Sequence, residues 1–293
     1  MELRELRYFL AVAREQNITR AAESLFLSQP SLSKQMQNLE KEIGRPLFVR
    51  GSRKIVLTEA GMLLKKRAEE MLELYEKTES ELTAPPEAVS GEISVGCGES
   101  RAVQTVADVA AGLRKQHPGL SFSFYSGDAS FVTERLDKGL LDFGILVDHP
   151  DLSRYHALRL PRSDVWGVLM RRDSPLAQKE AVTPGDLKDL PLICSHQSLR
   201  GDSRLSAWFG GQTETLRLAG KYNLLYTGSL LVQAGMGYAV SLDGLINTEG
   251  TDLCFRPLFP QVETFLDLVW KKYQVFSRPA QTFLDAMLAY CGG

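Results

Sequence analysis

The sequence has no long apolar run, no closely spaced cysteines and no excess of glycine or proline. Its 24 glycines and 13 prolines in 293 residues are too few for a collagen or a low-complexity chain. No apolar run approaches the roughly 18 residues that a membrane span needs. The first residues are charged, and the apolar stretch that follows them is too short for a secretory signal peptide. These absences predict a globular cytoplasmic protein with no membrane contact.

Sites for a metal, a cofactor or covalent catalysis are also missing. The four cysteines lie far apart and the four histidines are scattered, which argues against a disulfide scaffold and a zinc site. No Gly-x-Ser-x-Gly elbow, P-loop or His-x-x-x-His pair occurs. Gly96 and Gly98 begin like a dinucleotide fingerprint, but Arg101 stands where the third glycine is required. We therefore expect no cofactor, no metal and no enzymatic activity.

The formal net charge of −2 hides an uneven distribution of charge along the chain. Residues 1–57 carry ten Lys or Arg and six Asp or Glu, a net charge of +4, whereas residues 58–293 carry a net charge of −6. A basic first segment on an acidic body is typical of a small nucleic-acid-binding domain attached to a larger unit. A chance fluctuation of a few charges would look the same, so the motifs have to decide.

Three segments in this basic part have the apolar spacing of helices. Apolar residues recur at helical spacing from residue 3 to residue 13. The second helix carries the small pair Ala21 and Ala22, and Thr19 is its predicted N-cap. The third helix begins at Ser28, with a proline in its first turn, where the missing N–H costs nothing. Two short helices joined by a tight turn predict a helix-turn-helix.

A hairpin and a long helix follow. The β-prone runs at 47–49 and 54–57 flank a turn and predict the hairpin. From residue 58 the pattern predicts a helix of about 25 residues, roughly 37 Å long. A helix of this length with one apolar seam has nothing of its own to pack against, so self-association is favoured over packing in the core of the next domain. The seam consists of Leu57, Gly61, Leu64, Ala68, Met71, Tyr75, Thr78 and Leu82.

The Pro-Pro pair after this helix reads as a hinge, and beyond it strands alternate with helices. Such alternation over some 200 residues predicts parallel sheets in two α/β lobes. The expected strands are 92–96, 120–125, 142–147, 165–170, 192–194, 215–218, 238–241 and 266–270. The expected helices are one ending at 116, then 130–138, 184–189, 229–234 and 279–289.

The start of the third helix carries the residue types that read DNA. Short hydroxyl and amide side chains there can reach base edges in the major groove. Arginines in the hairpin would act as a wing that touches phosphates or the minor groove. The predicted DNA-binding residues are Gln29, Pro30, Ser31, Ser33, Lys34, Gln35, Arg50 and Arg53.

The same region closely resembles the LysR-type family of bacterial transcriptional regulators. The matching residues are 9–13, 18–25, 28–35, 39–40, 44–48, 50, 53 and 57–61, with looser matches at 142–145 and 232–240. The resemblance implies an α/β chain with a helical head, in which a winged helix-turn-helix and a dimerising linker helix precede a two-lobed effector domain like the periplasmic binding proteins. Dimers in this family commonly pair into tetramers. The implied divisions are a head at 1–58, a linker helix at 59–84, a hinge at 85–91 and an effector domain at 92–293, with lobe I at about 92–161 and 267–293 and lobe II at about 162–266.

The effector site is expected where strands end at the cleft between the lobes. In the family a small hydroxyl residue at the end of the first strand commonly touches the effector, and Ser100 matches it here. The N-terminus of the following helix would favour a carboxylate or phosphate, which Arg101 would strengthen and Glu99 would oppose. Each of these residues could instead only cap a helix. The predicted effector-binding residues are Cys97, Gly98, Ser100, Arg101, Ser126, Asp128, Ser195, His196 and Ser198.

The predicted function is therefore a DNA-binding transcriptional regulator switched by a small, anionic co-inducer. A dimer or tetramer would bind an interrupted palindrome of double-stranded DNA, and an activator would also contact RNA polymerase. Two rivals from other classes stay open: a solute-binding module with an accessory head, and an enzyme built on the two-lobed scaffold. Cys97 and Cys194 raise a further hypothesis of oxidation sensing, against the simpler interpretation of two small buried residues.

Overall fold

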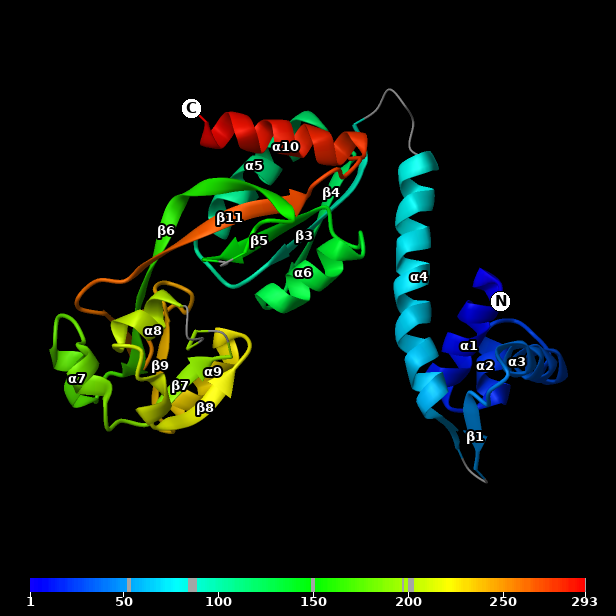
Figure 1. The fold of residues 1–293 in the computed structure, drawn as a ribbon, viewed down its shortest axis with the longest axis horizontal. Coiled ribbons are helices and arrows are strands. Elements are labelled where there is room, and N and C mark those ends of the chain that lie inside the picture. The colour runs from blue at the N-terminus through cyan, green and yellow to red at the C-terminus, as the bar shows by residue number, and fades with distance from the viewer. Residues whose placement is uncertain (52–53, 84–88, 149–150, 197, 200–202, 293) are drawn as a thin grey trace. The chain divides into compact units, whose positions relative to one another are not determined.

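The computed structural model describes residues 1–51, 54–83, 89–148, 151–196, 198–199 and 203–292. The chain divides into two compact units, Met1–Thr83 and Ala84–Gly293 (Figure 1). The predicted linker helix is part of the first unit, and most of the predicted hinge lies outside the described residues.

Three helices form the core of the first unit. They are α1 (Leu3–Glu15), α2 (Ile18–Ser24) and α3 (Gln29–Ile43). Their apolar residues meet in one cluster, in which Phe9, Leu32 and Met36 are almost completely buried. Ala21 and Ala22 are also buried there, as expected for small residues where two helices cross closely.

The caps of these helices agree with the sequence at α3 and differ at α2. Ser28 caps α3, and Gly44 ends it in the left-handed region at φ 76°. Thr19 is not the N-cap of α2, because the side chain of Asn17 accepts hydrogen bonds from the Thr19 and Arg20 N–H groups at 2.9 and 3.1 Å. The helix therefore begins at Ile18, and its N-cap lies two residues earlier than predicted.

A two-stranded hairpin, β1 (Phe48–Arg50) with β2 (Ile55–Leu57), is fixed to α3 by one carboxylate. The Glu40 side chain accepts hydrogen bonds from the Leu47 and Phe48 N–H groups at 2.8 and 3.1 Å. These bonds hold the base of the hairpin, which is the predicted wing, against α3.

The long helix α4 (Glu59–Thr83) corrects the prediction that it lacks a partner in its own head. Ala68 and Leu72 are buried against Leu6 of α1, and Leu64 packs beside them. The seam thus continues through Leu72 rather than Met71, and its first half faces the head. Other large apolar side chains of α4 stay exposed: Met62, Leu63, Met71, Leu74, Tyr75 and Leu82.

The described strands of the second unit form a nine-stranded sheet in the order β4-β3-β5-β11-β6-β9-β7-β8, with β10 paired to β6. The strands are β3 (Gly91–Cys97), β4 (Leu120–Ser126), β5 (Phe143–Val147), β6 (Tyr155–Arg171), β7 (Leu192–Ser195), β8 (Leu218–Tyr222), β9 (Tyr238–Leu242), β10 (Leu253–Pro257) and β11 (Glu263–Lys271). The sheet is mixed: β3, β4 and β5 are parallel, as are β7, β8 and β9, whereas β6, β10 and β11 pair antiparallel.

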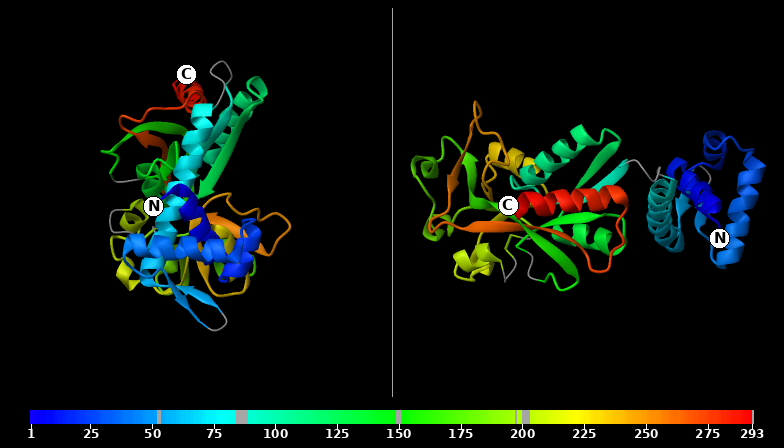
Figure 2. Two further views of the ribbon diagram at one scale, coloured as in Figure 1. Left: turned by 90° about the vertical axis from the view of Figure 1, so that its right-hand side faces the viewer. Right: turned by 90° about the horizontal axis from the view of Figure 1, so that it is seen from above.

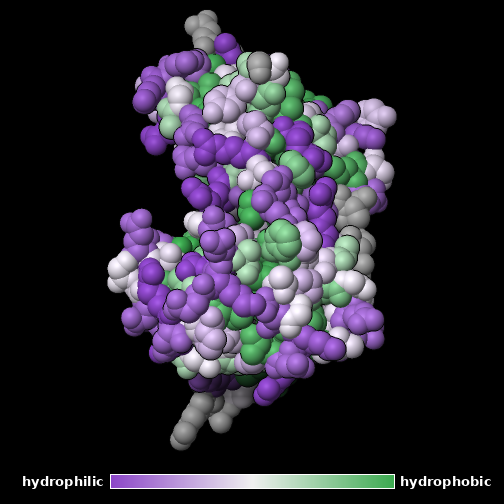
Figure 3. Space-filling view, turned by 90° about the vertical axis from the view of Figure 1, so that its left-hand side faces the viewer, coloured by the Kyte–Doolittle hydropathy of each residue, from purple (hydrophilic) through white to green (hydrophobic). Residues whose placement is uncertain are grey.

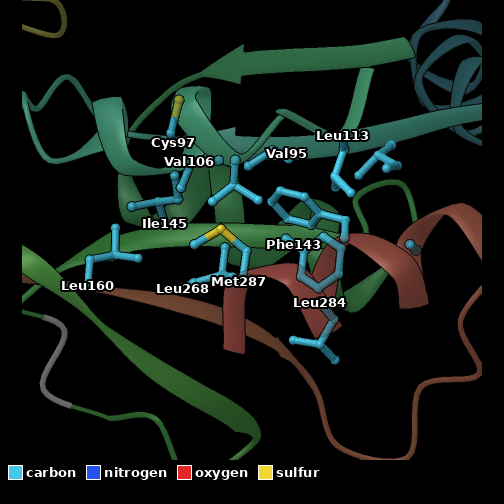
Figure 4. Close-up of a cluster of buried hydrophobic side chains, with 14 of the residues drawn as sticks. Val95, Cys97, Val106, Leu113, Phe143, Ile145, Leu160, Leu268, Leu284 and Met287 are labelled. Carbon is cyan, nitrogen blue, oxygen red and sulfur yellow. The ribbon is translucent and has the colours of Figure 1, made fainter. Parts of the chain in front are cut away.

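Helices cover both faces of this sheet. In lobe I, α5 (Val103–Gln116) and α10 (Arg278–Cys291) pack side by side on one face and α6 (Ala129–Asp137) on the other (Figures 1 and 2). Phe143 lies at the centre of lobe I, with its ring 5.0 Å from that of Phe283 (Figure 4). Lobe II carries η1 (Pro175–Gln178), α7 (Pro184–Leu187), α8 (Arg204–Trp208), η2 (Thr213–Thr215) and α9 (Leu225–Gln233).

Two strands, β6 and β11, pass through both lobes. On β6, Leu160 belongs to the core of lobe I and Val168 to that of lobe II. At the second crossing, Val262, just before β11, belongs to the core of lobe II, and Leu266 on β11 belongs to that of lobe I. Because the lobes share these two strands, a rotation of one lobe against the other has to bend or twist these strands.

The face of the molecule drawn in Figure 3 is mostly hydrophilic, with its hydrophobic residues scattered.

Several predicted elements of this unit need correction. The strand predicted at 165–170 begins ten residues earlier, at Tyr155. No strand covers 215–217, where the chain ends the turn η2, and the strand lies at 218–222 instead. Helix α9 begins at Leu225 rather than at residue 229. Neither α8 nor β10 was predicted.

Candidate functional site

The first turns of α3 present polar side chains to solvent. The exposed ones are Gln29, Pro30, Ser31 and Lys34, and the half-buried ones are Ser33 and Gln35. Leu32, Met36 and Leu39 face the core, and the predicted base-reading residues occupy the remaining part of the helix surface at its first turns. Arg50 ends β1, and Arg53 lies outside the described residues.

A cavity of about 500 Å³ opens between the two lobes of the second unit. Five predicted effector residues line it: Gly98, Asp128, Ser195, His196 and Ser198. Four do not line it: Cys97, Ser100, Arg101 and Ser126. Charged residues that were not predicted as effector contacts also line the cavity: Glu99, Asp148, Arg159, Arg204 and Asp267. Of these, only Glu99 was considered in the sequence, as a residue that would oppose an anion.

The junction before α5, where the sequence predicts an anion site, holds one of the protein's own carboxylates. The Ser100 hydroxyl donates a hydrogen bond to Asp164, a buried residue of β6. Backbone N–H groups of Arg101 and Ala102 also bond to this carboxylate. Burial raises the pKa of Asp164, against the lowering by these hydrogen bonds. No free donor is left at this helix start for an effector carboxylate.

Two further helix starts at the cavity, those of α6 and α9, are also capped by carboxylates. Asp128 accepts a hydrogen bond from the Phe131 N–H at 2.8 Å at the start of α6. Glu99, which extends from lobe I, accepts one from the Leu225 N–H at the start of α9 in lobe II. Glu99 therefore joins the lobes, whereas the sequence suggested only that it would repel an anion.

Two arginines from different lobes stack on one phenylalanine at the cavity. The Arg159 and Arg204 guanidinium carbons lie 5.2 and 5.4 Å from the centre of the Phe265 ring. Arg159 is bonded to Asp267 at 2.7 Å, and Arg204 lies 3.3 Å from Asp148. Both arginine side chains stay more than half exposed, at 57 and 55 %. Among the described residues that line the cavity, they are the arginines, and a ligand can reach both.

Comparison with known proteins decides the family. Residues 86–292 match the LysR substrate binding domain, and residues 3–62 match the bacterial regulatory helix-turn-helix protein, lysR family. The chain belongs to the LysR family of bacterial transcriptional regulators. It is thus a LysR-type regulator with a DNA-binding helix-turn-helix and an effector-binding domain.

Named relatives agree with this assignment. The Hca operon transcriptional activator HcaR of Escherichia coli is 33 % identical over 282 residues, covering 93 % of this chain and 92 % of that one. The transcriptional activator IlvY of Salmonella typhimurium is 33 % identical over 211 residues, 71 % of each chain. The structure of full-length CbnR with its target DNA matches with a TM-score of 0.78 at 21 % identity, covering 100 % of this chain and 99 % of that one, and so shares the fold.

In this LysR-type regulator the remaining predicted effector residues lie away from the cavity. Arg101 lies against Gly244, where a Cβ would come within 2.4 Å of the arginine Cδ, and it lines a second hollow on lobe II. Cys97 faces the core of lobe I (Figure 4), and Ser126 is exposed at the end of β4.

Neither a metal centre nor a membrane span is found in the part of the chain that the structure describes. There, no three His, Cys, Asp or Glu side chains come together as a metal site. Among the same residues, no helix is both long and apolar enough to cross a membrane.

The cysteines of the second unit differ in burial, and their reactivity should differ accordingly. Burial raises the pKa of the Cys97 thiol, and it raises that of Cys194 to about 12. Both thiols are therefore protonated and inert at neutral pH. With an aromatic disulfide reagent at pH 8, we expect the half-exposed Cys291 to react first, and the buried Cys97, Cys194 and Cys254 only on unfolding. An oxidant response that disappears when Cys97 and Cys194 are both replaced by serine would contradict this.

Proposed function

We propose that this LysR-type regulator binds an interrupted palindrome through α3 and the wing, and that a small effector in the interlobe cavity switches it. The observation that carries the DNA part is the polar start of α3, where Gln29 and Lys34 are exposed beside a closed apolar core. Arg50 and Arg53 of the hairpin are the proposed contacts to phosphate or the minor groove. Because its target is DNA, the regulator acts in the cytoplasm, by binding rather than catalysis.

We propose the exposed side of α4 as the dimer contact. Met62, Leu63 and Leu82 are 58, 61 and 81 % exposed, although they are large and apolar. A second copy of the helix would bury them and set two heads in two-fold symmetry, as a palindrome requires. Dimers could then pair into tetramers, and an activating complex would also touch RNA polymerase.

The proposed effector is anionic and binds at Arg159 and Arg204 rather than at the start of α5. These guanidinium groups are over half exposed, and each already bonds to an internal carboxylate. An effector carboxylate would therefore compete with Asp267 and Asp148. Since Arg159 and Arg204 come from different lobes, a ligand bound to both would favour one lobe angle over others, which is what a switch needs.

Ser195, His196 and Ser198 are the proposed polar partners on lobe II, with Gly98 and Asp128 on lobe I. Ser195 and Ser198 already bond to each other's backbone and hold the loop after β7 in place. The change in lobe angle that the effector favours would be transmitted to the heads through α4, and it would change the spacing of the heads on DNA.

The effector proposal is tested with Arg204→Gln. A panel of small carboxylates is screened by thermal unfolding of the full chain, where a ligand at 100 times its dissociation constant adds about 2.7 kcal/mol. We expect Arg204→Gln to weaken a hit roughly tenfold or more, because a charge-assisted hydrogen bond is lost, while DNA affinity stays unchanged.

The matched control is Arg217→Gln, an exposed arginine of lobe II that does not line the cavity. It should leave both binding and DNA affinity unchanged. Full retention of the thermal shift by Arg204→Gln would contradict the proposed anion site. Turnover of the hit would instead favour the enzyme alternative.

A further inference from the structure

Phe26 lies in an unusual position for a large aromatic residue. It is 98 % exposed, in the turn between α2 and α3. Its backbone has φ 55°, in the left-handed region. Its neighbours Leu25 and Leu27 both pack against the core of the head, so the chain buries one residue on each side and turns Phe26 outward.

The fold gives no reason for a phenylalanine here. Asparagine adopts the left-handed region several times more readily than bulky residues, and its side chain is at home in water. The turn itself is made by backbone bonds that any residue can supply: Phe26 N–H to the Glu23 oxygen at 3.1 Å, and Leu27 N–H to the Ala22 oxygen at 2.8 Å. An exposed aromatic ring in a strained turn therefore points to a contact outside the head.

The position of the turn indicates which contact this is. Phe26 precedes the N-cap Ser28 by two residues and Gln29 by three. At 3.8 Å per residue, its Cα can lie at most about 11 Å from that of Gln29. The major groove is about 12 Å wide. When the start of α3 enters the groove, the rim, where the sugar-phosphate backbone runs, is thus within reach of Phe26.

We propose that Phe26 packs its ring against a deoxyribose of the DNA backbone, beside the bases that α3 reads. This inference rests on the proposed DNA-facing role of α3. At the rim the sugar is the apolar surface available to an uncharged ring, whereas phosphates are reached by charged and hydrogen-bonding groups. The contact adds affinity without reading sequence.

The test compares Phe26→Asn with wild type on two duplexes, one selected from a random pool by the wild-type protein and one of unrelated sequence. We expect affinity for both to fall by the same factor, roughly five- to thirty-fold per head for the burial of part of one ring. The slope of log K against log salt should not change, because no charge is lost. The head should unfold a few degrees higher, since the strained turn is relieved.

Two further variants serve as controls. Phe26→Leu keeps an apolar side chain and should retain most of the affinity. Tyr273→Asn makes the same change at a residue of the second unit with φ 63° and 97 % exposure, and it should leave DNA affinity unchanged.

Unchanged affinity of Phe26→Asn would overturn the proposal, as would a changed salt slope or a loss confined to the selected duplex, which would indicate a base contact. If wild type showed no preference for any duplex, the proposed function itself would fail. If wild type preferred the selected duplex and Phe26→Asn bound both duplexes as tightly as wild type does, this inference alone would fail.

Discussion

Replacing Gly61 by alanine is expected to destabilise the head by about 1–3 kcal/mol and to weaken DNA binding at least tenfold. In most helices this change stabilises, because glycine costs about 0.5–1 kcal/mol relative to alanine. Here a Cβ would lie 2.1 Å from the Leu47 carbonyl oxygen, a backbone atom that cannot move aside by itself. Helix α4 or the base of the wing has to shift.

The neighbouring contacts make that shift costly. The Thr58 hydroxyl donates to the Pro46 oxygen at 2.8 Å and accepts from the Gly61 N–H at 3.0 Å. The Thr58 N–H also bonds to the Leu47 oxygen at 3.0 Å. A displaced wing would move Arg50 and Arg53, the proposed backbone contacts, so affinity should fall on all sequences.

Thermal unfolding and a DNA-binding titration check this prediction. The matched control is Gly112→Ala in α5, where a Cβ would meet no atom within 4 Å. It should stabilise the second unit slightly and leave DNA binding unchanged. A Gly61→Ala protein as stable as wild type, with the same affinity, would show that the contact between α4 and the wing is looser than described.

Replacing Gln29 by alanine is expected to lower discrimination between the selected duplex and its single-base variants by about 1–3 kcal/mol at one position of each half-site. Gln29 is exposed on the first turn of α3, where its amide can bond two atoms of one base edge. Binding to unrelated DNA should barely change, because no phosphate contact is lost. Ser33→Ala should act in the same way at a neighbouring position.

Charged residues of the same surface should behave differently. Lys34→Ala and Arg53→Ala should weaken binding on all sequences and reduce the salt slope by about one each per head. Titrations at several salt concentrations separate the two classes. Equal loss of discrimination in both would contradict the division between base-reading and backbone-binding residues.

The head could be predicted closely because its signals are local. The Ser28 cap, the proline in the first turn and Gly44 lie within the segment that they delimit, so α3 was predicted correctly. The start of α2 was wrong because Asn17 and Thr19 are both good caps, and only the hydrogen bonds of Asn17 decide between them. The error in the α4 seam came from α1, whose Leu6 covers Leu72 through a contact that spacing alone does not show.

The effector cavity could be predicted only in part because its charges pair across long distances in sequence. Asp164 and Ser100 are 64 residues apart, and Arg159 and Asp267 are 108 apart. The first half of β6, which carries Arg159 and Asp164, has charged residues and Pro161 in place of an apolar run, so no strand was expected there. The positions where the strands end were predicted, and this identified Ser195 and Asp128 as cavity residues. The capping of the helix N-termini by side chains of the protein was not predicted.

The most direct test of the account is footprinting of the full chain on duplexes that it selects from a random pool. The account predicts two half-sites related by two-fold symmetry, with centres about 10 base pairs or a multiple of that apart, and protection that changes when the effector is added. A single asymmetric site would contradict it, and so would a selection in which the protein binds all duplexes of the pool equally well.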